Sequence, residues 1–120
     1  MKIACTASGP SLDDQLDGRF GRASVFIIYN LESDSFEVLD NTQNLEAAQG
    51  AGIQAAQHVA QSGARAVITG HTGPKAFKVL ESAGIAIFVC SAMTVRQAIA
   101  AYKEGSLTQI READVEGHWV

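Results

Sequence analysis

A chain of 120 residues fits one ordinary domain, and 47% apolar residues are enough to build a core without disulfide or metal staples. Thirteen acidic against nine basic residues give a net charge of −4, which argues against non-specific binding to nucleic acid or to an anionic membrane surface. Residues 1–8 lack the apolar stretch of a secretory signal and no later run is long enough to cross a membrane, so we expect a cytoplasmic protein.

The first half of the chain alternates short apolar runs with loops. Residues 2–8 predict a strand, which opens into the long loop GPSLDDQLDGRFGRA, and residues 24–31 form a nearly continuous apolar run, typical of a strand buried on both faces. Turn residues at 33–35 and a further run at 36–41 predict a hairpin. Apolar residues at helical spacing then predict a helix within 49–63, which Gly63 ends.

The second half alternates strands and helices. ARAVITG at 64–70 and IAIFVC at 85–90 predict strands, and Pro74 suits the first turn of the helix between them. Thr94 with Gln97 predicts a capping box for a last helix that ends at Gly105. Residues 108–120 have no clean period, so we expect one domain at 1–107 and a C-terminal tail.

This order predicts an α/β fold of three layers around a mixed five-stranded sheet. Right-handed crossovers make the later strands parallel, in the order 3-2-1-4-5 with strand 2 antiparallel to the rest. Strands 1 and 4 then connect in opposite directions, and open α/β sheets bind ligands beyond the carboxyl ends of strands at such a switch point. We expect the loops at 9–23, 42–52, 70–74 and 90–94 to gather at this edge.

The sequence GAGIQA, residues 50–55, satisfies the glycine pattern of a dinucleotide fingerprint. No strand leads directly into these glycines, and no acidic residue follows about 20 positions later to hold a ribose. Nucleotide binding is therefore kept as an alternative, beside a packing role for the glycines. A nuclease of the ribonuclease-H architecture would share the strand order, but it needs a carboxylate in strand 1, where this chain has Ala4, Cys5 and Thr6.

Three cations stand out near the predicted edge. Arg19 and Arg22 lie in the loop after the first strand, and Lys75 lies in the first turn of a helix, where a cation opposes the helix dipole unless an anion is bound. Glycine-rich turns that lead into helices expose backbone N–H groups to anions. The sequence thus predicts a site for a compact polyanion. Pairing of Arg19 and Lys75 with Asp13, Asp14 or Asp17 is the alternative.

The remaining candidate groups are a histidine and two thiols. His71 lies at a strand-to-helix joint on the same edge, where a functional and a structural role are equally open. Cys5 and Cys90 fall in or beside apolar strands and have no metal-ligand spacing, so we expect buried free thiols.

Four segments together, GRFGRA, GAGIQAAQ, AVITGHTGPKAFKVLESAGI and TVRQAIAAYKEG, resemble the dinitrogenase iron–molybdenum cofactor biosynthesis family from about Met1 to Leu107. The resemblance implies a ribonuclease-H-like fold and a non-enzymatic carrier of iron–molybdenum cofactor or its precursors. Within the family, the chain is most similar to members that carry a mixed molybdenum–copper sulfide cluster without covalent attachment. Other proteins would then be partners in cluster transfer. An interaction module that docks through an acidic surface and the tail with Trp119 is a further alternative.

The resemblance also implies cofactor-binding residues, and these are Phe20, Gly21, Arg22, Gly50, Gly52, Gly70 and Gly73. Many members carry His and Asn where this chain has Arg19 and His71, which favours a cluster held by charge and hydrogen bonds. On this interpretation Gly70 and Gly73 let the backbone approach the ligand, and Thr72 donates a hydrogen bond. Lys75 and the arginines balance negative sulfur, and His71 donates to a sulfide or ligates copper.

Overall fold

The structure of the protein is a computed structural model that describes residues 1–41 and 51–111. In chain order its elements are β1 (Lys2–Ala7), β2 (Val25–Asn30), β3 (Ser35–Asp40), α2 (Ala51–Gln61), β4 (Ala64–Thr69), α3 (Pro74–Ser82), β5 (Ala86–Val89), α4 (Val95–Glu104) and β6 (Thr108–Ile110). Each predicted strand and helix is present, with ends displaced by one or two residues.

The strands form one mixed sheet in the order β3-β2-β1-β4-β5-β6. β2 is antiparallel to both β1 and β3, whereas β1, β4 and β5 run parallel. The predicted order is confirmed, but the predicted number of strands is wrong by one. Residues 108–110 form β6, which pairs antiparallel with β5 from Ile87 opposite Ile110 to Val89 opposite Thr108. The partner of this short strand lies about 20 residues earlier in the chain, so no local sequence pattern predicts the strand.

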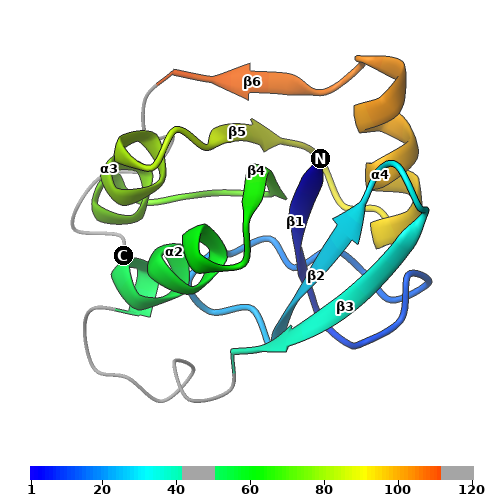
Figure 1. Cartoon of the computed structure of the whole chain (residues 1–120), viewed down its shortest axis with the longest axis horizontal. Coiled ribbons are helices and arrows are strands. Elements are labelled where there is room, and N and C mark those ends of the chain that lie inside the picture. Colours follow the sequence, from blue (N-terminus) through cyan, green and yellow to red (C-terminus); the bar gives the residue numbers. More distant parts are fainter. Residues whose placement is uncertain (42–50, 112–120) are drawn as a thin grey trace.

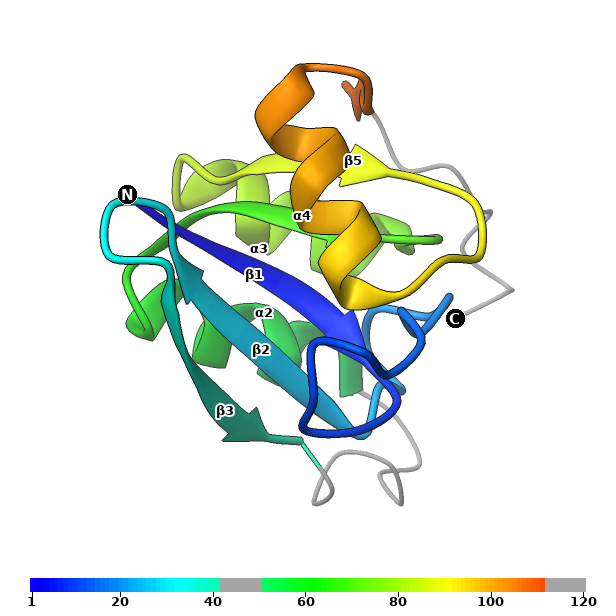
Figure 2. The same ribbon diagram turned by 90° about the vertical axis from the view of Figure 1, so that its right-hand side faces the viewer.

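Helices cover the two faces of the sheet unequally. α2 and α3 lie on one face and α4 lies on the other, beside the loop that follows β1 (Figures 1 and 2). Buried side chains of β1, β2, β4 and β5 such as Phe26, Ile28 and Val67 pack against α2 and α3, and a second cluster that includes Ile3 and Ile27 packs against α4. The loop after β1 contributes Leu16 to this second cluster, so this loop and α4 together cover that face of the sheet.

The ends of α4 follow the predicted chemistry. The Thr94 hydroxyl accepts a hydrogen bond from the backbone N–H of Gln97, and the Gln97 side chain accepts one from the backbone N–H of Thr94. This confirms the capping box. Gly105 ends the helix at φ 74°, a left-handed conformation that residues with a Cβ adopt at a cost.

A polar cluster joins α4 to the turn between β2 and β3. The Asp34 carboxylate accepts hydrogen bonds from the Tyr29 hydroxyl at 2.6 Å and from the Lys103 ammonium at 3.0 Å. The Lys103 Nζ also lies 5.3 Å from the centre of the Tyr29 ring. Asp34 itself has a φ of 54°, which aspartate tolerates better than most residues.

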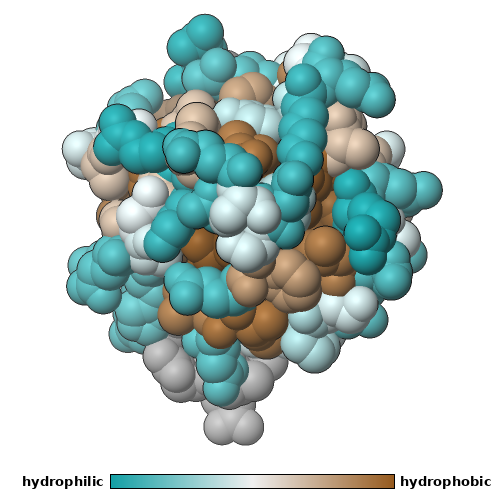
Figure 3. All heavy atoms as spheres, turned by 45° about the vertical axis from the view of Figure 1, so that its right-hand side comes forward, coloured by the Kyte–Doolittle hydropathy of each residue, from teal (hydrophilic) through white to brown (hydrophobic). Residues whose placement is uncertain are grey.

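Strand β3 leaves apolar surface uncovered. Phe36 and Val38 are 41% and 42% exposed, since α4 does not reach as far as this edge of the sheet. Figure 3 looks toward this side and shows brown apolar surface among teal polar side chains. Within residues 1–41 and 51–111, no helix is long and apolar enough to span a membrane.

Candidate functional site

Three loops far apart in sequence meet at the carboxyl edge of the parallel strands. Leu16 donates its backbone N–H to the carbonyl of Met93 at 2.8 Å, which joins the loop after β1 to the loop after β5. Arg19 forms a parallel bridge with His71, and the Phe20 N–H donates to the His71 carbonyl at 3.2 Å. The predicted meeting of the loops at 9–23, 70–74 and 90–94 is confirmed, whereas residues 42–50 of the fourth loop lie outside the described chain.

The loop after β1 is fastened to the end of that strand through Asp17. The Thr6 hydroxyl donates to the Asp17 carbonyl at 2.6 Å, and the Asp17 N–H donates to the Thr6 carbonyl at 2.9 Å. The Asp17 carboxylate in turn accepts the backbone N–H of Arg19 at 2.9 Å. Arg19 therefore begins from a fixed backbone position, although its side chain is exposed.

Gly70 admits this loop. A Cβ built at residue 70 would lie 2.7 Å from the Cα of Gly18 and 2.8 Å from its carbonyl oxygen. We expected Gly70 to let the backbone approach a ligand, and the backbone that approaches it is the protein's own loop. The glycine is required by the fold of the site.

The turn after β4 leads into a helix whose first turn has no side-chain cap. Gly73 is the N-cap residue of α3, with φ −81° and ψ 170°, and Pro74 follows. Gly73 has no side chain with which to cap the helix, and no acidic residue lies in the first turn of α3, so neither opposes the positive end of the helix dipole. Thr72 is 2% exposed, and its hydroxyl donates a long hydrogen bond to the Gly73 carbonyl at 3.5 Å. Its predicted hydrogen bond to a ligand stays a prediction.

Two of the three predicted cations lie at this edge with no carboxylate partner in the described part of the chain. Arg19 and Lys75 are exposed, and neither makes an ion pair within residues 1–41 and 51–111. Among the carboxylates considered as their alternative partners, Asp13 pairs with Arg96 at 2.9 Å and thereby has its pKa lowered. Pairing of Arg19 or Lys75 with these aspartates is therefore not observed.

The next residues carried over from the family motifs are Phe20, Gly21 and Arg22, and the first two contact other parts of the protein. Phe20 is 2% exposed and packs on Phe26 with ring centres 5.4 Å apart, so its ring anchors the loop in the core. The Gly21 carbonyl accepts a hydrogen bond from the Asn41 side chain at 3.3 Å. Arg22 is half-buried. Phe20 thus positions the loop through the core, and its predicted role in binding a cofactor stays a prediction.

The glycines of the GAGIQA sequence divide between described and undescribed parts of the chain. Gly50 lies outside the described residues. Gly52 lies in the first turn of α2, where a Cβ would come within 3.2 Å of the Cβ of Ala76 in α3. This close approach of α2 to α3 favours the packing role that the sequence left open for the glycines.

The two thiols are in the core or beside it. Cys5 is fully buried, and both burial and the charge of Cys90 raise the pKa of its thiol. Cys90 is half-buried, and burial raises its pKa as well. Within the described residues, no three His, Cys, Asp or Glu side chains form a group that would hold a metal ion. His71, the predicted copper ligand, is exposed beside Arg19.

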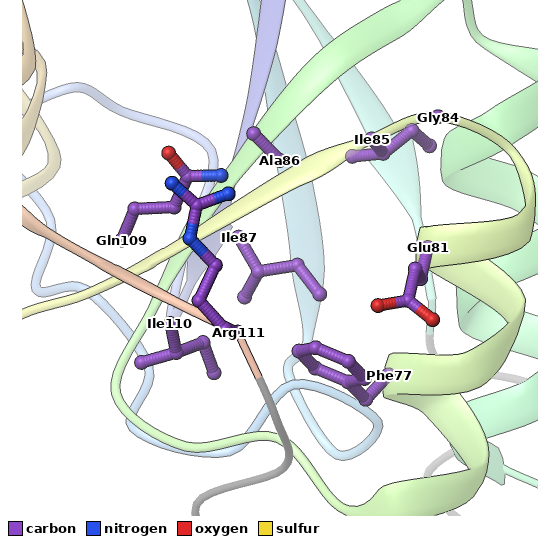
Figure 4. A pocket seen from close by; sticks show the side chains of 9 residues that line it. All are labelled: Phe77, Glu81, Gly84, Ile85, Ala86, Ile87, Gln109, Ile110 and Arg111. Carbon is purple, nitrogen blue, oxygen red and sulfur yellow. The ribbon is translucent and has the colours of Figure 1, made fainter.

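A pocket of about 220 Å³ lies between α3, β5 and β6, toward the other end of the sheet. Figure 4 shows Phe77, Ile87 and Ile110 around the hollow, with Glu81 and Arg111 on opposite sides. None of the predicted site residues lines it. The pocket and the cationic edge are therefore separate features.

Two residues that shape the site escaped the sequence analysis. Thr6 and Asp17 fix the loop that carries Arg19, but a threonine in a strand and an aspartate in a loop are unremarkable by residue type. Only the position of Thr6 could have indicated its role, because Thr6 lies near the carboxyl end of β1, the strand that flanks the switch point.

The fold and this edge together define a class of small α/β proteins, with a six-stranded mixed sheet and an edge of three loops that carries two exposed cations. The chain belongs to the family described as Dinitrogenase iron-molybdenum cofactor, whose sequence profile matches residues 1–105. This match confirms the resemblance that the four sequence segments indicated.

Solved structures and a relative agree with the assignment. The apo form of the orange protein from Desulfovibrio gigas is 40% identical and gives a TM-score of 0.92, over 95% of this chain and 96% of that one. A putative NifB protein from Thermotoga is 33% identical with a TM-score of 0.80, over 90% and 91% of the two chains. An uncharacterised protein of Methanocaldococcus jannaschii is 30% identical over 110 residues, 89% of either chain.

Proposed function

We propose that this protein is a non-enzymatic carrier of an anionic, molybdenum-containing metal–sulfur cluster, held at the carboxyl edge of the sheet without covalent attachment. The observation that supports it most is the pair of exposed cations, Arg19 and Lys75, beside the uncapped positive end of α3. Membership of a family described by an iron–molybdenum cofactor supports a metal cluster as the anion.

The charges at the edge favour recognition by electrostatics. An exposed cation in the first turn of a helix is slightly destabilising alone, and an anion bound there reverses the sign of that contribution. Lys75 occupies this position, and Arg19 is brought to the same turn by the bridge to His71. A compact sulfide cluster with several negative sulfur atoms would satisfy both cations and the backbone N–H groups together.

The molybdenum–copper sulfide type is the cargo that the sequence resemblance implies, with iron–molybdenum cofactor or a precursor as the alternative. His71 would donate to a sulfide or bind copper from its exposed position. The cysteines are poor candidates for ligands, because thiolates are the ligating form and burial keeps the Cys5 thiol protonated.

Reconstitution tests the proposal directly. Apoprotein mixed with copper and tetrathiomolybdate should retain a visible chromophore after desalting. Each charge-assisted hydrogen bond contributes about 1.5–3 kcal/mol, or about 10- to 150-fold in affinity. The Arg19→Ala/Lys75→Ala double variant should therefore emerge colourless.

Two control variants separate the edge from the alternatives. The Arg65→Ala/Lys78→Ala variant loses the same number of exposed positive charges at other positions and should still retain the chromophore. Cys5→Ala/Cys90→Ala should colour too, and alanine avoids burying a serine hydroxyl at the fully buried position 5. A folded cysteine variant that emerges colourless would refute the electrostatic mechanism. A wild-type protein that retains no chromophore would refute the proposed function itself.

A further inference from the structure

Two threonine hydroxyls lie buried beneath the loop that carries Arg19. Thr6 is the second-to-last residue of β1 and Thr69 is the last residue of β4, and both are 0% exposed. The two hydroxyl oxygens are 3.0 Å apart, and the Thr6 oxygen is 2.6 Å from the Asp17 carbonyl oxygen. Valine has nearly the same shape and would fill either position without a buried polar group, so the hydroxyls need an explanation.

The inventory of protons fixes the direction of these hydrogen bonds. A hydroxyl has one proton to donate and two lone pairs with which to accept, whereas a carbonyl oxygen only accepts. The Thr6 proton must therefore go to the Asp17 carbonyl, and the proton between the two hydroxyls must come from Thr69. The chain of donors runs from Thr69 to Thr6 to Asp17.

Thr6 consequently holds Asp17 at two points, since its carbonyl also accepts the Asp17 N–H at 2.9 Å. Only the hydroxyl bond depends on the side chain. Asp17 transmits this placement through its carboxylate to the Arg19 N–H, and the adjoining Gly18 rests against Gly70 of the turn before α3. The side chain of Thr6 is thereby linked to the distance between Arg19 and the helix end at Lys75.

We propose that Thr6 is a positioning residue for the cluster site and that its hydroxyl sets Arg19 against the turn before α3. This inference rests on the proposed function. It predicts an order of effects. Thr6→Val leaves the Asp17 carbonyl without its side-chain donor, whereas Thr69→Val leaves the bond from Thr6 to Asp17 intact. Thr6→Ser retains the hydroxyl and should restore wild-type behaviour.

The first arm of the test needs no cargo. Amide hydrogen exchange of the apoprotein, followed by NMR at Asp17 and Phe20, reports whether residues 17–20 stay fixed to β1 and to the turn before α3. In Thr6→Val both amides should exchange about 5- to 150-fold faster, the range that corresponds to one buried acceptor left unsatisfied. Exchange in Thr69→Val and Thr6→Ser should stay within about 3-fold of wild type on the same scale.

The second arm measures affinity by titration of tetrathiomolybdate with copper, read from the visible spectrum. Thr6→Val should bind about 5- to 150-fold more weakly, and Thr69→Val and Thr6→Ser should bind as wild type does. Val59→Ala removes buried volume from α2, away from the edge, and serves as the control for lost stability. It should bind normally while folded.

The inference is overturned if Thr6→Val binds like wild type, if Thr69→Val loses as much affinity as Thr6→Val, or if Val59→Ala weakens binding equally. Unchanged amide exchange in Thr6→Val also overturns it. A wild-type protein that binds no cargo refutes the proposed function instead. In that case the exchange arm still decides whether the Thr6 hydroxyl fixes the loop.

Discussion

Gly70→Ala tests the contact on which the site is built. The added methyl would stand 2.7 Å from the Cα of Gly18, whereas carbon atoms in contact are about 3.5–4.0 Å apart. The clashing atoms belong to the Gly18 backbone, which the hydrogen bonds around Asp17 hold in place. They therefore cannot move away as the end of a flexible side chain would. Forcing an extra methyl into such a space costs about 1–3 kcal/mol, which at about 4 °C per kcal/mol lowers Tm by about 4–12 °C.

Gly18→Ala is the matched control, because it adds the same methyl to the other side of the same contact. A Cβ at residue 18 meets nothing within 4 Å, and Gly18 is not among the glycines with a positive φ. Its stability should be unchanged or up to about 1 kcal/mol higher, since alanine restricts the unfolded chain. Urea unfolding at neutral pH measures both variants. Equal losses in the two, or no loss in Gly70→Ala, would refute the assigned geometry.

Three further outcomes follow from the described contacts. Hydrogen bonds from the neighbouring hydroxyl and ammonium hold the pKa of Asp34 below its usual value, so the stability they supply is present above about pH 4 and lost as the pH falls through the lowered pKa. Urea midpoints of Asp34→Asn should accordingly fall less steeply on acidification than those of wild type, and parallel curves would contradict this. Thr94→Ala should lower the free energy of unfolding by about 0.5–2 kcal/mol through loss of the N-cap, whereas Thr94→Ser should lose little; equal losses would count against the capping box. Alkylation of the native protein should modify Cys90 first and reach fully buried Cys5 only on unfolding, which mass spectrometry would reveal as unequal rates.

Most of the fold was predictable because its signals are local. Buried strands such as β2 read as continuous apolar runs, and the capping box at Thr94 marks a helix start within four residues. The alternation of strands and helices then restricts the sheet order through the handedness of crossovers. β6 escaped because three residues, two of them exposed, carry no period, and its place in the sheet is set by pairing with β5.

The site was predictable in outline and not in detail. The prediction that the loop of Arg19 lies beside the turn before Lys75 is confirmed, because this neighbourhood depends only on strand order. The roles of Gly70 and Phe20 depend instead on how an aperiodic loop folds back on the strand ends. Sequence spacing cannot distinguish a glycine that admits a ligand from one that admits the chain's own backbone.

The loop after β1 has anchors that come from distant parts of the chain, and this has a consequence during synthesis. Leu16 is held by Met93 and Phe20 by His71, so the loop emerges from the ribosome long before the residues that fix it. Such non-local contacts form late in folding, after the costly closure of large loops. A nascent chain that exposes only its first half therefore cannot assemble the cationic edge, which forms only when the residues that anchor the loop have been synthesised.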